Sequence, residues 1–241
     1  MNPFSLEGRT ALVTGANTGI GQAIAVAMAQ AGAEVIAAAR RDCDETLALM
    51  GSGRALRLDF ADPMAARDVF ASERIDILVN NAGIIRRADA VDFTEADWDA
   101  VMDVNMKALF FTCQAFARAA LPRGAGKIVN IASLLSFQGG IRVPSYTASK
   151  HGVAGLTKLM ANEWAARGLN VNAIAPGYIE TNNTSALRAD PDRSKAILDR
   201  IPAGRWGKPE DIAQTAVFLS APASGYVNGA VLNVDGGWLA R

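Results

Sequence analysis

Short apolar runs alternate with longer segments that carry helix signals along nearly the whole chain. The runs have the length of buried strands and lie at residues 10–14, 34–39, 54–58, 75–79, 127–132, 170–175 and 231–234. The segments between them predict helices that end near residue 31 or span residues 63–72, 95–121, 145–166, 192–200 and 209–219. Strands that alternate with helices form a parallel sheet covered on both faces. The sequence therefore predicts an α/β fold, a doubly wound parallel sheet of about seven strands with helices on both faces.

Local signals support several of these helices. Pro63 and Pro209 lie where a first helical turn tolerates proline, and Thr94 is a good N-cap for the long helix. No linker, repeat or low-complexity segment divides the chain, so we expect a single domain over residues 1–241. Residues from about 178 to 208 are less regular, and we expect them to form a substrate loop.

The composition narrows the classes of function. Half of the 241 residues are hydrophobic, and 24 Lys and Arg balance 24 Asp and Glu, so nothing favours nucleic acid or an anionic membrane surface as a partner. Cys43 and Cys113 are too few for a disulfide framework and favour a reducing compartment. His151 is the only histidine, which disfavours Ser-His-Asp catalysis and leaves no Cys/His cluster for a metal ion. The N-terminus lacks the features of a signal peptide, so we expect a cytoplasmic protein.

A glycine-rich turn joins the first predicted strand to the first helix. It contains Gly15, Gly19 and Gly21 and opens an Ala-rich helix. Backbone N–H groups and the positive end of a helix then lie where a pyrophosphate can bind, and glycine lets the phosphate approach the backbone. The spacing, G-x-x-x-G-x-G, differs from the G-x-G-x-x-G of the standard dinucleotide fingerprint. A purely structural turn is the alternative, but the position between strand and helix favours phosphate binding in a Rossmann-like fold.

Residues with distinctive chemistry follow six of the predicted strands at their carboxyl ends. They are Gly15, Arg40, Asp59, Asn80, Ser133 and Pro176. In an open parallel sheet, ligands bind beyond the carboxyl ends of the strands. The sequence therefore predicts one binding site along one edge of the sheet.

Tyr146 and Lys150 are the candidate acid–base pair. Their spacing of four residues puts them on one face of the helix predicted at residues 145–166. A free phenol has a pKa near ~10, and lowering that pKa to neutrality takes roughly 4 kcal/mol. One ammonium group about 4 Å away supplies energy of that order at an effective dielectric constant of ~20. The alternative is an ordinary Tyr–Lys pair on a helix surface.

The combined motifs resemble the classical short-chain dehydrogenase/reductase family over essentially the whole chain. The matching residues are Thr14-Gly15-x-x-x-Gly19-x-Gly21, Asn80-Asn81-Ala82-Gly83, Asn105, Ser133, Tyr146-x-x-x-Lys150 and Pro176-Gly177. The resemblance implies that Tyr146 is the acid–base residue and that Ser133 holds the substrate oxygen. It also implies that Lys150 lowers the phenol pKa and binds the nicotinamide ribose, and that Asn105 positions a water in the proton relay.

The same resemblance implies hydride exchange with a nicotinamide cofactor. The residues implied to bind the cofactor are Gly15, Asn17, Thr18, Gly19, Ile20, Gly21, Arg40, Asp59, Asn81, Ala82, Gly83, Tyr146, Lys150, Pro176, Gly177, Ile179 and Thr181. An acidic residue after the second strand favours NAD, whereas arginine suits the 2′-phosphate of NADP. Here the position is Arg40, which favours NADP unless this side chain only stacks on adenine or faces solvent.

The substrate half resembles the branch of the family that acts on sugar acids, namely keto-deoxy hexonates from pectin or alginate breakdown. This finer match rests on residues 83–87, 136–146, 177–184 and 235–241. Members of the branch are usually NAD-linked, which opposes the preference inferred from Arg40. A sugar acid needs a cation for its carboxylate and polar partners for its hydroxyls. The candidate partners are Ser133, Tyr146, Arg86, Arg142, Gln138, Asn182 and Asn183, with Arg87, Arg188 and Arg205 as a surplus.

Alternatives remain open at the substrate site. Each polar candidate, taken singly, is also explained as a solvated surface residue. The next hypotheses are other reductases of carbonyls, such as a gluconate 5-dehydrogenase or a 3-oxoacyl thioester reductase, although a long apolar substrate would want an aliphatic channel. A non-catalytic nucleotide-binding protein is the most remote. We expect Trp206 and Trp238 to pack in a core or at a subunit contact, and the family resemblance implies a homotetramer.

Overall fold

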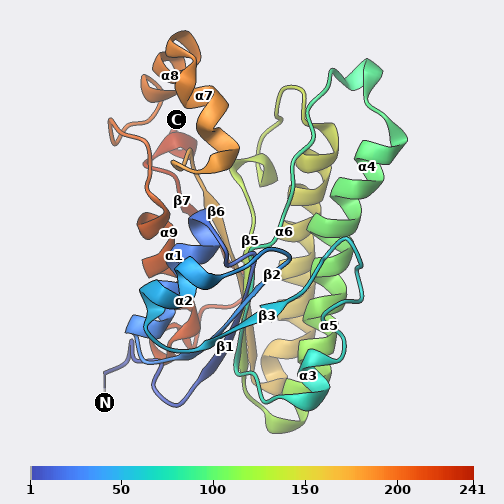
Figure 1. Ribbon diagram of the computed structural model, residues 1–241, viewed down its shortest axis with the longest axis vertical. Helices are drawn as coiled ribbons and strands as arrows, with labels where there is room; N and C mark the ends of the chain where they lie inside the picture. The colour runs from blue at the N-terminus through green and yellow to red at the C-terminus, as the bar shows by residue number, and fades with distance from the viewer. Residues whose placement is uncertain (1) are drawn as a thin grey trace.

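Seven parallel strands form one sheet in the computed structural model, which describes residues 2–241 (Figure 1). The strands are β1 (Thr10–Thr14), β2 (Glu34–Ala39), β3 (Arg54–Arg57), β4 (Ile77–Asn80), β5 (Gly126–Ile131), β6 (Leu169–Pro176) and β7 (Val231–Val234). Their order is β3-β2-β1-β4-β5-β6-β7, and each neighbouring pair is parallel. The chain starts inside the sheet, winds out to β3, crosses back past β1 and continues to β7. This confirms the predicted doubly wound α/β fold.

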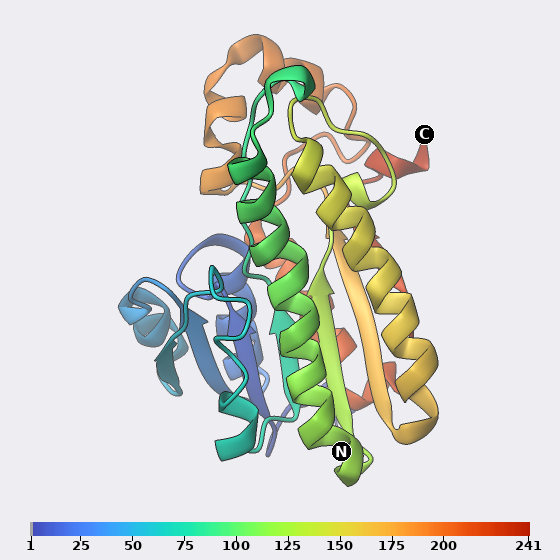
Figure 2. The same ribbon diagram turned by 90° about the vertical axis from the view of Figure 1, so that its right-hand side faces the viewer.

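Helices cover both faces of the sheet. The helices are α1 (Gly19–Gln30), α2 (Asp44–Met50), α3 (Val69–Ser72), α4 (Glu95–Met102), α5 (Leu109–Ala120), α6 (Pro144–Trp164), α7 (Ser185–Ala189), α8 (Pro191–Leu198) and α9 (Pro209–Ser220). One face carries α1, α2 and α9. In Figure 2, α4 and α5 follow each other in one long helix, which lies beside α6 in front of the other face. The short helices α7 and α8 lie beyond the carboxyl ends of the strands (Figure 1). Within residues 2–241, none of the helices has the length and apolarity needed to cross a membrane.

The central strands contribute side chains to both cores. In β1, Ala11 and Val13 belong to the core under α1 and α9, whereas Leu12 belongs to the core under α5 and α6. Successive side chains of a strand point to opposite faces, so a strand covered on both sides must be apolar at every position. This explains why these strands are continuous apolar runs in the sequence.

The helix predicted for residues 63–72 is largely wrong. Only Val69–Ser72 is helical, and the residues before it form turns. The Asp59 carboxylate accepts a hydrogen bond from Ala61 N at 3.0 Å, and the Asp62 carboxylate accepts one from Met64 N at 2.9 Å. Aspartate side chains that bond the backbone two residues further on stabilise turns in competition with a helix.

The sequence patterns also do not predict α2, although its ends carry ordinary helix signals. Asp44 and Glu45 lie in its first turn, where acidic side chains interact favourably with the helix dipole. Gly51 follows its last residue with φ of 68°, the left-handed conformation in which glycine often ends a helix. The helix was missed because its seven residues are too few to show a clear periodicity.

The long helix predicted for residues 95–121 is present, but it contains one π-helical turn. Residues Asp103–Ala108 form this turn between α4 and α5. The helix begins as predicted, because the Thr94 hydroxyl accepts a hydrogen bond from Asp97 N at 3.2 Å. Isolated π turns inside helices are frequent at functional sites. Asn105, a candidate site residue, lies within this one.

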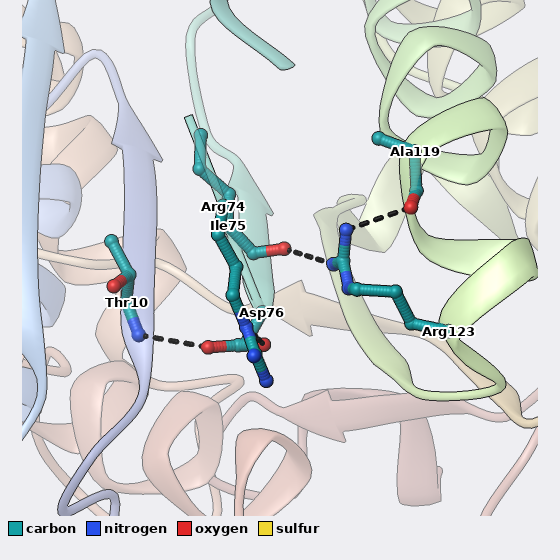
Figure 3. A network of polar contacts seen from close by, with 6 residues as sticks. All are labelled: Thr10, Arg74, Ile75, Asp76, Ala119 and Arg123. Carbon is teal, nitrogen blue, oxygen red and sulfur yellow. Dashed lines mark hydrogen bonds and ion pairs between the residues drawn. The ribbon is translucent and has the colours of Figure 1, made fainter. Parts of the chain in front are cut away.

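A buried carboxylate holds the amino-end edge of the sheet, opposite the predicted site (Figure 3). Asp76 accepts a hydrogen bond from Thr10 N at 3.3 Å and pairs with Arg74 Nε at 3.2 Å. Beside it, Arg123 Nη2 donates to the carbonyl of Ile75 at 2.7 Å. These contacts fasten the start of β4 to β1 on one side and to the end of α5 on the other.

Asp76→Ala is predicted to lower the free energy of unfolding by about 1–3 kcal/mol, because the N–H of Thr10 loses its acceptor. Urea denaturation of the purified protein measures this change. Asp76→Asn keeps an acceptor oxygen in place and should lose clearly less. An equal loss in both variants would show that the charge of Asp76, and not its hydrogen bond to Thr10, stabilises this edge.

Candidate active site

Helix α6 brings the candidate acid–base pair to the carboxyl-end edge of the sheet. Its first turn contains Pro144, so Tyr146 and Lys150 lie within its first two turns. Lys150 Nζ lies 5.5 Å from the centroid of the Tyr146 ring, and the two side chains share one face of the helix. Lys150 Nζ also donates a hydrogen bond to the carbonyl of Ile131 at 2.6 Å. Because Ile131 ends β5, this bond fastens the start of α6 to the strand that leads to Ser133.

A cleft beside this pair gathers residues from several strand ends. The predicted residues that line it are Ile20, Asn81, Gly83, Ser133, Tyr146, Lys150, Pro176, Gly177, Ile179, Thr181 and Asn183. Residues that line it without having been predicted are Ile84, Ile131, Ala132 and Thr184. Apart from Tyr146 and Lys150, which lie in α6, the lining residues follow or end β1, β4, β5 and β6, as expected for a site at the carboxyl edge of a parallel sheet. Among residues 2–241, no group of three or more His, Cys, Asp and Glu side chains is placed to hold a metal ion.

The Ser133 hydroxyl is free to donate a hydrogen bond. Its oxygen accepts a hydrogen bond from Leu135 N at 3.1 Å, within the short turn that follows β5. A hydroxyl has one proton and two lone pairs, so this contact leaves the proton available. Ser133 lines the cleft together with Tyr146, and both can therefore reach one substrate oxygen there.

Burial controls the protonation of the acid–base pair. It raises the pKa of the Tyr146 phenol above its ordinary value, against smaller opposing contributions from the neighbouring Ser133 hydroxyl and from the charge of Arg87. Lys150, which the family resemblance expects to lower this pKa, is not among these contributions, and its effect on the phenol stays a prediction. The phenol is consequently protonated at neutral pH and can act as a proton donor. Burial also lowers the pKa of Lys150, to about 8.

The glycine turn after β1 has the geometry that phosphate binding requires. Gly15 and Gly19 have φ of 64° and 58°, in the left-handed region that favours glycine. A Cβ on Gly21 would lie 2.2 Å from the carbonyl oxygen of Gly15, so the turn also needs glycine there. Thr18, the N-cap residue of α1, makes no side-chain cap hydrogen bond within the described residues. The first N–H groups of the helix, with Asn17 and Ile20 beside them, are therefore available to a pyrophosphate.

Thr14, the last residue of β1, ties the glycine turn to the loop after β4. Its hydroxyl accepts hydrogen bonds from Asn81 N and Ala82 N, each at 3.0 Å. The Asn81 amide donates in return to the carbonyls of Thr14 and Gly15, at 3.0 and 3.1 Å. Asn81 thus shapes the turn as well as lining the cleft. This role could not be inferred from spacing, because it depends on β1 lying next to β4.

Asn105 holds the loop after β4 from behind. Its side chain is buried, and its amide forms two hydrogen bonds with the backbone of Ile84, from Ile84 N at 2.8 Å and to Ile84 O at 2.9 Å. Its Nδ2 also donates to Ser149 Oγ at 3.3 Å. The π-helical turn thereby joins the cleft wall to α6. The water-positioning role that the family resemblance implies for Asn105 stays a prediction.

Arg40 and Asp59 meet beyond the ends of β2 and β3. Arg40 Nη1 lies 3.9 Å from Asp59 Oδ2, and the two side chains are 68% and 51% exposed. An ion pair this long and exposed contributes little to stability. The Arg40 guanidinium is therefore able to take a stronger anionic partner.

Four predicted substrate residues do not line the cleft, namely Arg86, Arg142, Asn182 and, as described below, Gln138. Arg142 has φ of 63°, the only positive φ among the non-glycine residues of the described chain, and its Nε lies 3.0 Å from Asp89 Oδ1. Arg86 Nε lies 3.2 Å from Asp97 Oδ1. Asn182 is exposed. Both arginines therefore already have carboxylate partners outside the cleft.

Arg87, which the sequence analysis placed only in the surplus, lies nearer to the chemistry. Its Nη2 donates a hydrogen bond to the carbonyl of Asn183 at 3.2 Å, and its charge acts on Tyr146. Asn183 itself lines the cleft. Gln138 does not line it, and its Oε1 instead accepts a hydrogen bond from Trp238 Nε1 at 3.3 Å. Arg86 and Arg87 are adjacent in the sequence but have different partners, a carboxylate for Arg86 and a backbone carbonyl for Arg87. The fold, and not the sequence spacing, determines which arginine lies beside a carboxylate.

The lowered pKa of Lys150 predicts how stability depends on pH. The folded protein releases this proton near pH 8, whereas the unfolded chain keeps it until about pH 10.4. Between these values the unfolded state binds more protons, so this contribution to the free energy of unfolding should rise with pH, by roughly 3 kcal/mol in total. Urea denaturation across this range should show the rise in the wild type and its loss in Lys150→Met. Lys158→Met, at an exposed lysine of the same helix, is the control. Equal slopes for wild type and Lys150→Met would contradict the prediction.

Known proteins resemble this chain along its full length. The family model described as enoyl-(acyl carrier protein) reductase matches residues 15–239. The 2-dehydro-3-deoxy-D-gluconate 5-dehydrogenase of Dickeya dadantii is 55% identical, over 100% of this chain and 99% of that protein.

Two solved structures extend the comparison. An Agrobacterium tumefaciens protein, provisionally assigned as a 2-deoxy-D-gluconate 3-dehydrogenase and bound to NADP, is 74% identical, with a TM-score of 0.99 over 100% of both chains. A Beutenbergia cavernae protein, provisionally assigned as an NAD(P)-dependent gluconate 5-dehydrogenase and bound to NADP at low occupancy, is 51% identical, with a TM-score of 0.97 over 100% of both chains. Together with the sheet order and the motifs that meet at its carboxyl edge, these matches show that the chain belongs to the short-chain dehydrogenase/reductase family.

Proposed function

We propose that this protein is an NADP-dependent oxidoreductase that interconverts a keto group and a hydroxyl on a small sugar acid of the 2-keto-3-deoxygluconate type. The observation that carries the proposal is that Ser133, Tyr146 and Lys150 line one cleft with residues from the ends of β1, β4 and β6. The sugar-acid relatives described above support the substrate class.

The side chains of the cleft supply the proton and hold the substrate oxygen. A bound nicotinamide supplies the hydride for reduction, or accepts it in the reverse direction. Tyr146 donates its phenolic proton to the carbonyl oxygen and takes it back during oxidation. Ser133 donates a hydrogen bond to the same oxygen, which keeps it near the phenol. Lys150, with Nζ 5.5 Å from the ring centroid, places a positive charge beside the phenolate left after proton transfer. Asn105 is proposed to connect this pair to a water.

Arg40 supports the preference for NADP over NAD. It follows β2 directly, where an acidic residue would bind the 2′-hydroxyl of NAD. Its carboxylate contact within residues 2–241 is the 3.9 Å pair with Asp59, so the guanidinium can bind a 2′-phosphate instead. Both similar structures described above hold NADP.

Arg87 is proposed to bind the substrate carboxylate. Arg86, Arg142 and Arg205 are each within 3.2 Å of a carboxylate oxygen of the protein. Arg87 has no such partner among residues 2–241, and its charge acts on the Tyr146 phenol. Arg87 donates to the carbonyl of Asn183, and a substrate carboxylate beside it would supply the anionic partner that this guanidinium lacks among residues 2–241.

A gluconate 5-dehydrogenase is the second candidate, because the Beutenbergia cavernae relative carries that assignment. Its substrate is also a small acid with several hydroxyls, so Arg87 and Asn183 would serve it equally. A 3-oxoacyl thioester reductase fits less well, because the substrate loop presents the polar residues Thr181, Asn183 and Thr184 to the cleft. Such side chains suit hydroxyl groups better than an acyl chain.

We also propose that the protein is a cytoplasmic homotetramer. The buried cysteines Cys43 and Cys113 are free, in keeping with a reducing compartment. Trp98 and Leu159, on α4 and α6, are 38% and 45% exposed and offer apolar surface for subunit contacts.

An activity panel tests the proposed function. The purified protein should reduce keto-deoxy hexonates faster than neutral ketoses or a 3-oxoacyl thioester, and it should use NADPH in preference to NADH. Arg40→Ala should reduce that cofactor preference. Tyr146→Phe should bind NADPH normally but lose turnover by about 10²- to 10⁴-fold, because the ring remains and the transferable proton does not. Near-normal turnover in Tyr146→Phe, or a preference for the thioester, would contradict the proposal.

Arg87→Ala should raise KM for the sugar acid by about 10- to 100-fold, in line with the loss of a hydrogen bond to a charged group worth ~1.5–3 kcal/mol. The KM for a neutral polyol should change little. Arg142→Ala is the matched control, because it removes a nearby arginine that already pairs with Asp89. A larger effect in Arg142→Ala would assign carboxylate recognition to Arg142, which is one of the candidates from the sequence.

A further inference from the structure

A third hydrophobic cluster lies apart from the two cores that flank the sheet. Its buried members are Leu134, Ile197, Ile201, Trp206 and Trp238. They come from the turn after β5, from the substrate loop and from the C-terminal tail. In Figures 1 and 2 the C-terminus lies at the same end of the molecule as α7 and α8. The substrate loop therefore has a small core of its own, to which the end of the chain contributes.

Trp238 is the residue of this cluster with the most varied contacts. Its side chain is 4% exposed, and its Nε1 donates a hydrogen bond to Gln138 Oε1 at 3.3 Å. The guanidinium carbon of Arg200 lies 3.9 Å from its ring centroid, and the ring of Tyr178 lies 4.7 Å away, centroid to centroid. One indole thus touches the segment after Ser133, the start of the substrate loop and the loop segment that follows α8.

Hydrogen bonds hold the tail and the loop together around this indole. Ala203 N donates to Gly236 O at 2.9 Å, and Arg241 Nη2 donates to the carbonyl of Asp199 at 2.9 Å. The Asp235 carboxylate accepts hydrogen bonds from two N–H groups of the tail, at 2.8 and 2.9 Å. The tail is therefore ordered by its own contacts, and it can serve as a fixed support for the loop.

The neighbours of Trp238 are adjacent in sequence to residues of the cleft. Leu134 follows Ser133, and Tyr178 lies between Gly177 and Ile179, which both line the cleft. The turn that holds Ser133 and the start of the substrate loop thus pack on the same side chain. A shift of the indole would change the spacing between the Ser133 hydroxyl and the loop that carries Asn183.

We propose that Trp238 is a positioning residue of the active site, which fixes the substrate loop and the Ser133 turn relative to each other without touching the substrate. Gln138, expected from the sequence to bind substrate, instead orients the indole. A tryptophan that only stabilised the tail would contribute to the melting temperature. Its replacement would leave kcat and KM of the folded protein unchanged. A positioning residue changes KM and kcat in the folded protein as well.

The test compares Trp238→Ala and Trp238→Phe with Trp164→Ala, which removes a partly buried tryptophan at the opposite end of α6. Trypsin cleavage within the substrate loop, at Arg188, Arg193 or Lys195, is followed in the presence of NADPH. Trp238→Ala should be cleaved there about tenfold faster than the wild type, because local opening of the loop becomes easier. Its kcat/KM for the best acid of the activity panel should fall by about tenfold, with the Kd of NADPH within about twofold. Trp164→Ala should lower the melting temperature, but it should change neither the rate of cleavage within the substrate loop nor kcat/KM.

Unchanged cleavage in Trp238→Ala, or faster cleavage with unchanged kcat/KM, would overturn the proposal. If Trp238→Ala does not fold, Trp238→Phe, Gln138→Leu and the double variant replace it. Since these remove one shared hydrogen bond, their effects on kcat/KM should be non-additive, and additive effects would overturn the proposal. The turnover measurement rests on the proposed function, whereas the cleavage measurement does not. A wild type that turns over no acid of the panel would contradict the proposed function alone, and the cleavage rates would then decide the role of Trp238.

Discussion

The hydrogen bonds between the ends of β1 and β4 fix the glycine turn and the loop after β4 relative to each other. The Asn81 amide lies under the glycine turn and donates to the carbonyls of Thr14 and Gly15. A Cβ on Gly21 would lie 2.4 Å from this amide nitrogen, so glycine at that position is required by Asn81 as much as by a phosphate. The turn, the helix after it and the loop after β4 are therefore fitted to one another before any ligand binds. Such preorganisation lowers the cost of binding.

The catalytic helix is held to the sheet by a second set of polar contacts. Asn80 Nδ2 donates to Asn130 Oδ1 at 2.9 Å, and Asn130 Nδ2 donates to Thr157 Oγ1 at 3.0 Å, which joins β4, β5 and α6. These groups are buried, and a buried polar group without its partner is costly. Sliding α6 along the sheet would break the chain of bonds. Buried hydrogen bonds away from the cleft thus fix the position of α6 along the sheet, and this position places Tyr146 and Lys150 beside Ser133.

Features set by local patterns were predictable, and features set by distant partners were not. The seven strands and the spacing of Tyr146 and Lys150 follow from apolar runs and helix geometry, and the structure shows both. The helix predicted for residues 63–72 was largely wrong because aspartate side chains form hydrogen bonds that compete with those of a helix. Arg142 looked more suitable than Arg87 in the sequence, since the carboxylate of Asp89 that pairs with Arg142 becomes its neighbour only in the fold. The net rise of the Tyr146 pKa likewise depends on burial, which no spacing reveals.

The π-helical turn at Asp103–Ala108 limits how this helix can change in length during evolution. Deleting one residue there would restore α-helical hydrogen bonding but turn α5 by ~100° relative to α4. Either Asn105 would then leave the backbone of Ile84, or Phe116 of α5, which is fully buried, would leave the core. The extra residue in the turn satisfies both demands at once. Deleting a residue of this turn would therefore disrupt either the support of the cleft or the core under α5.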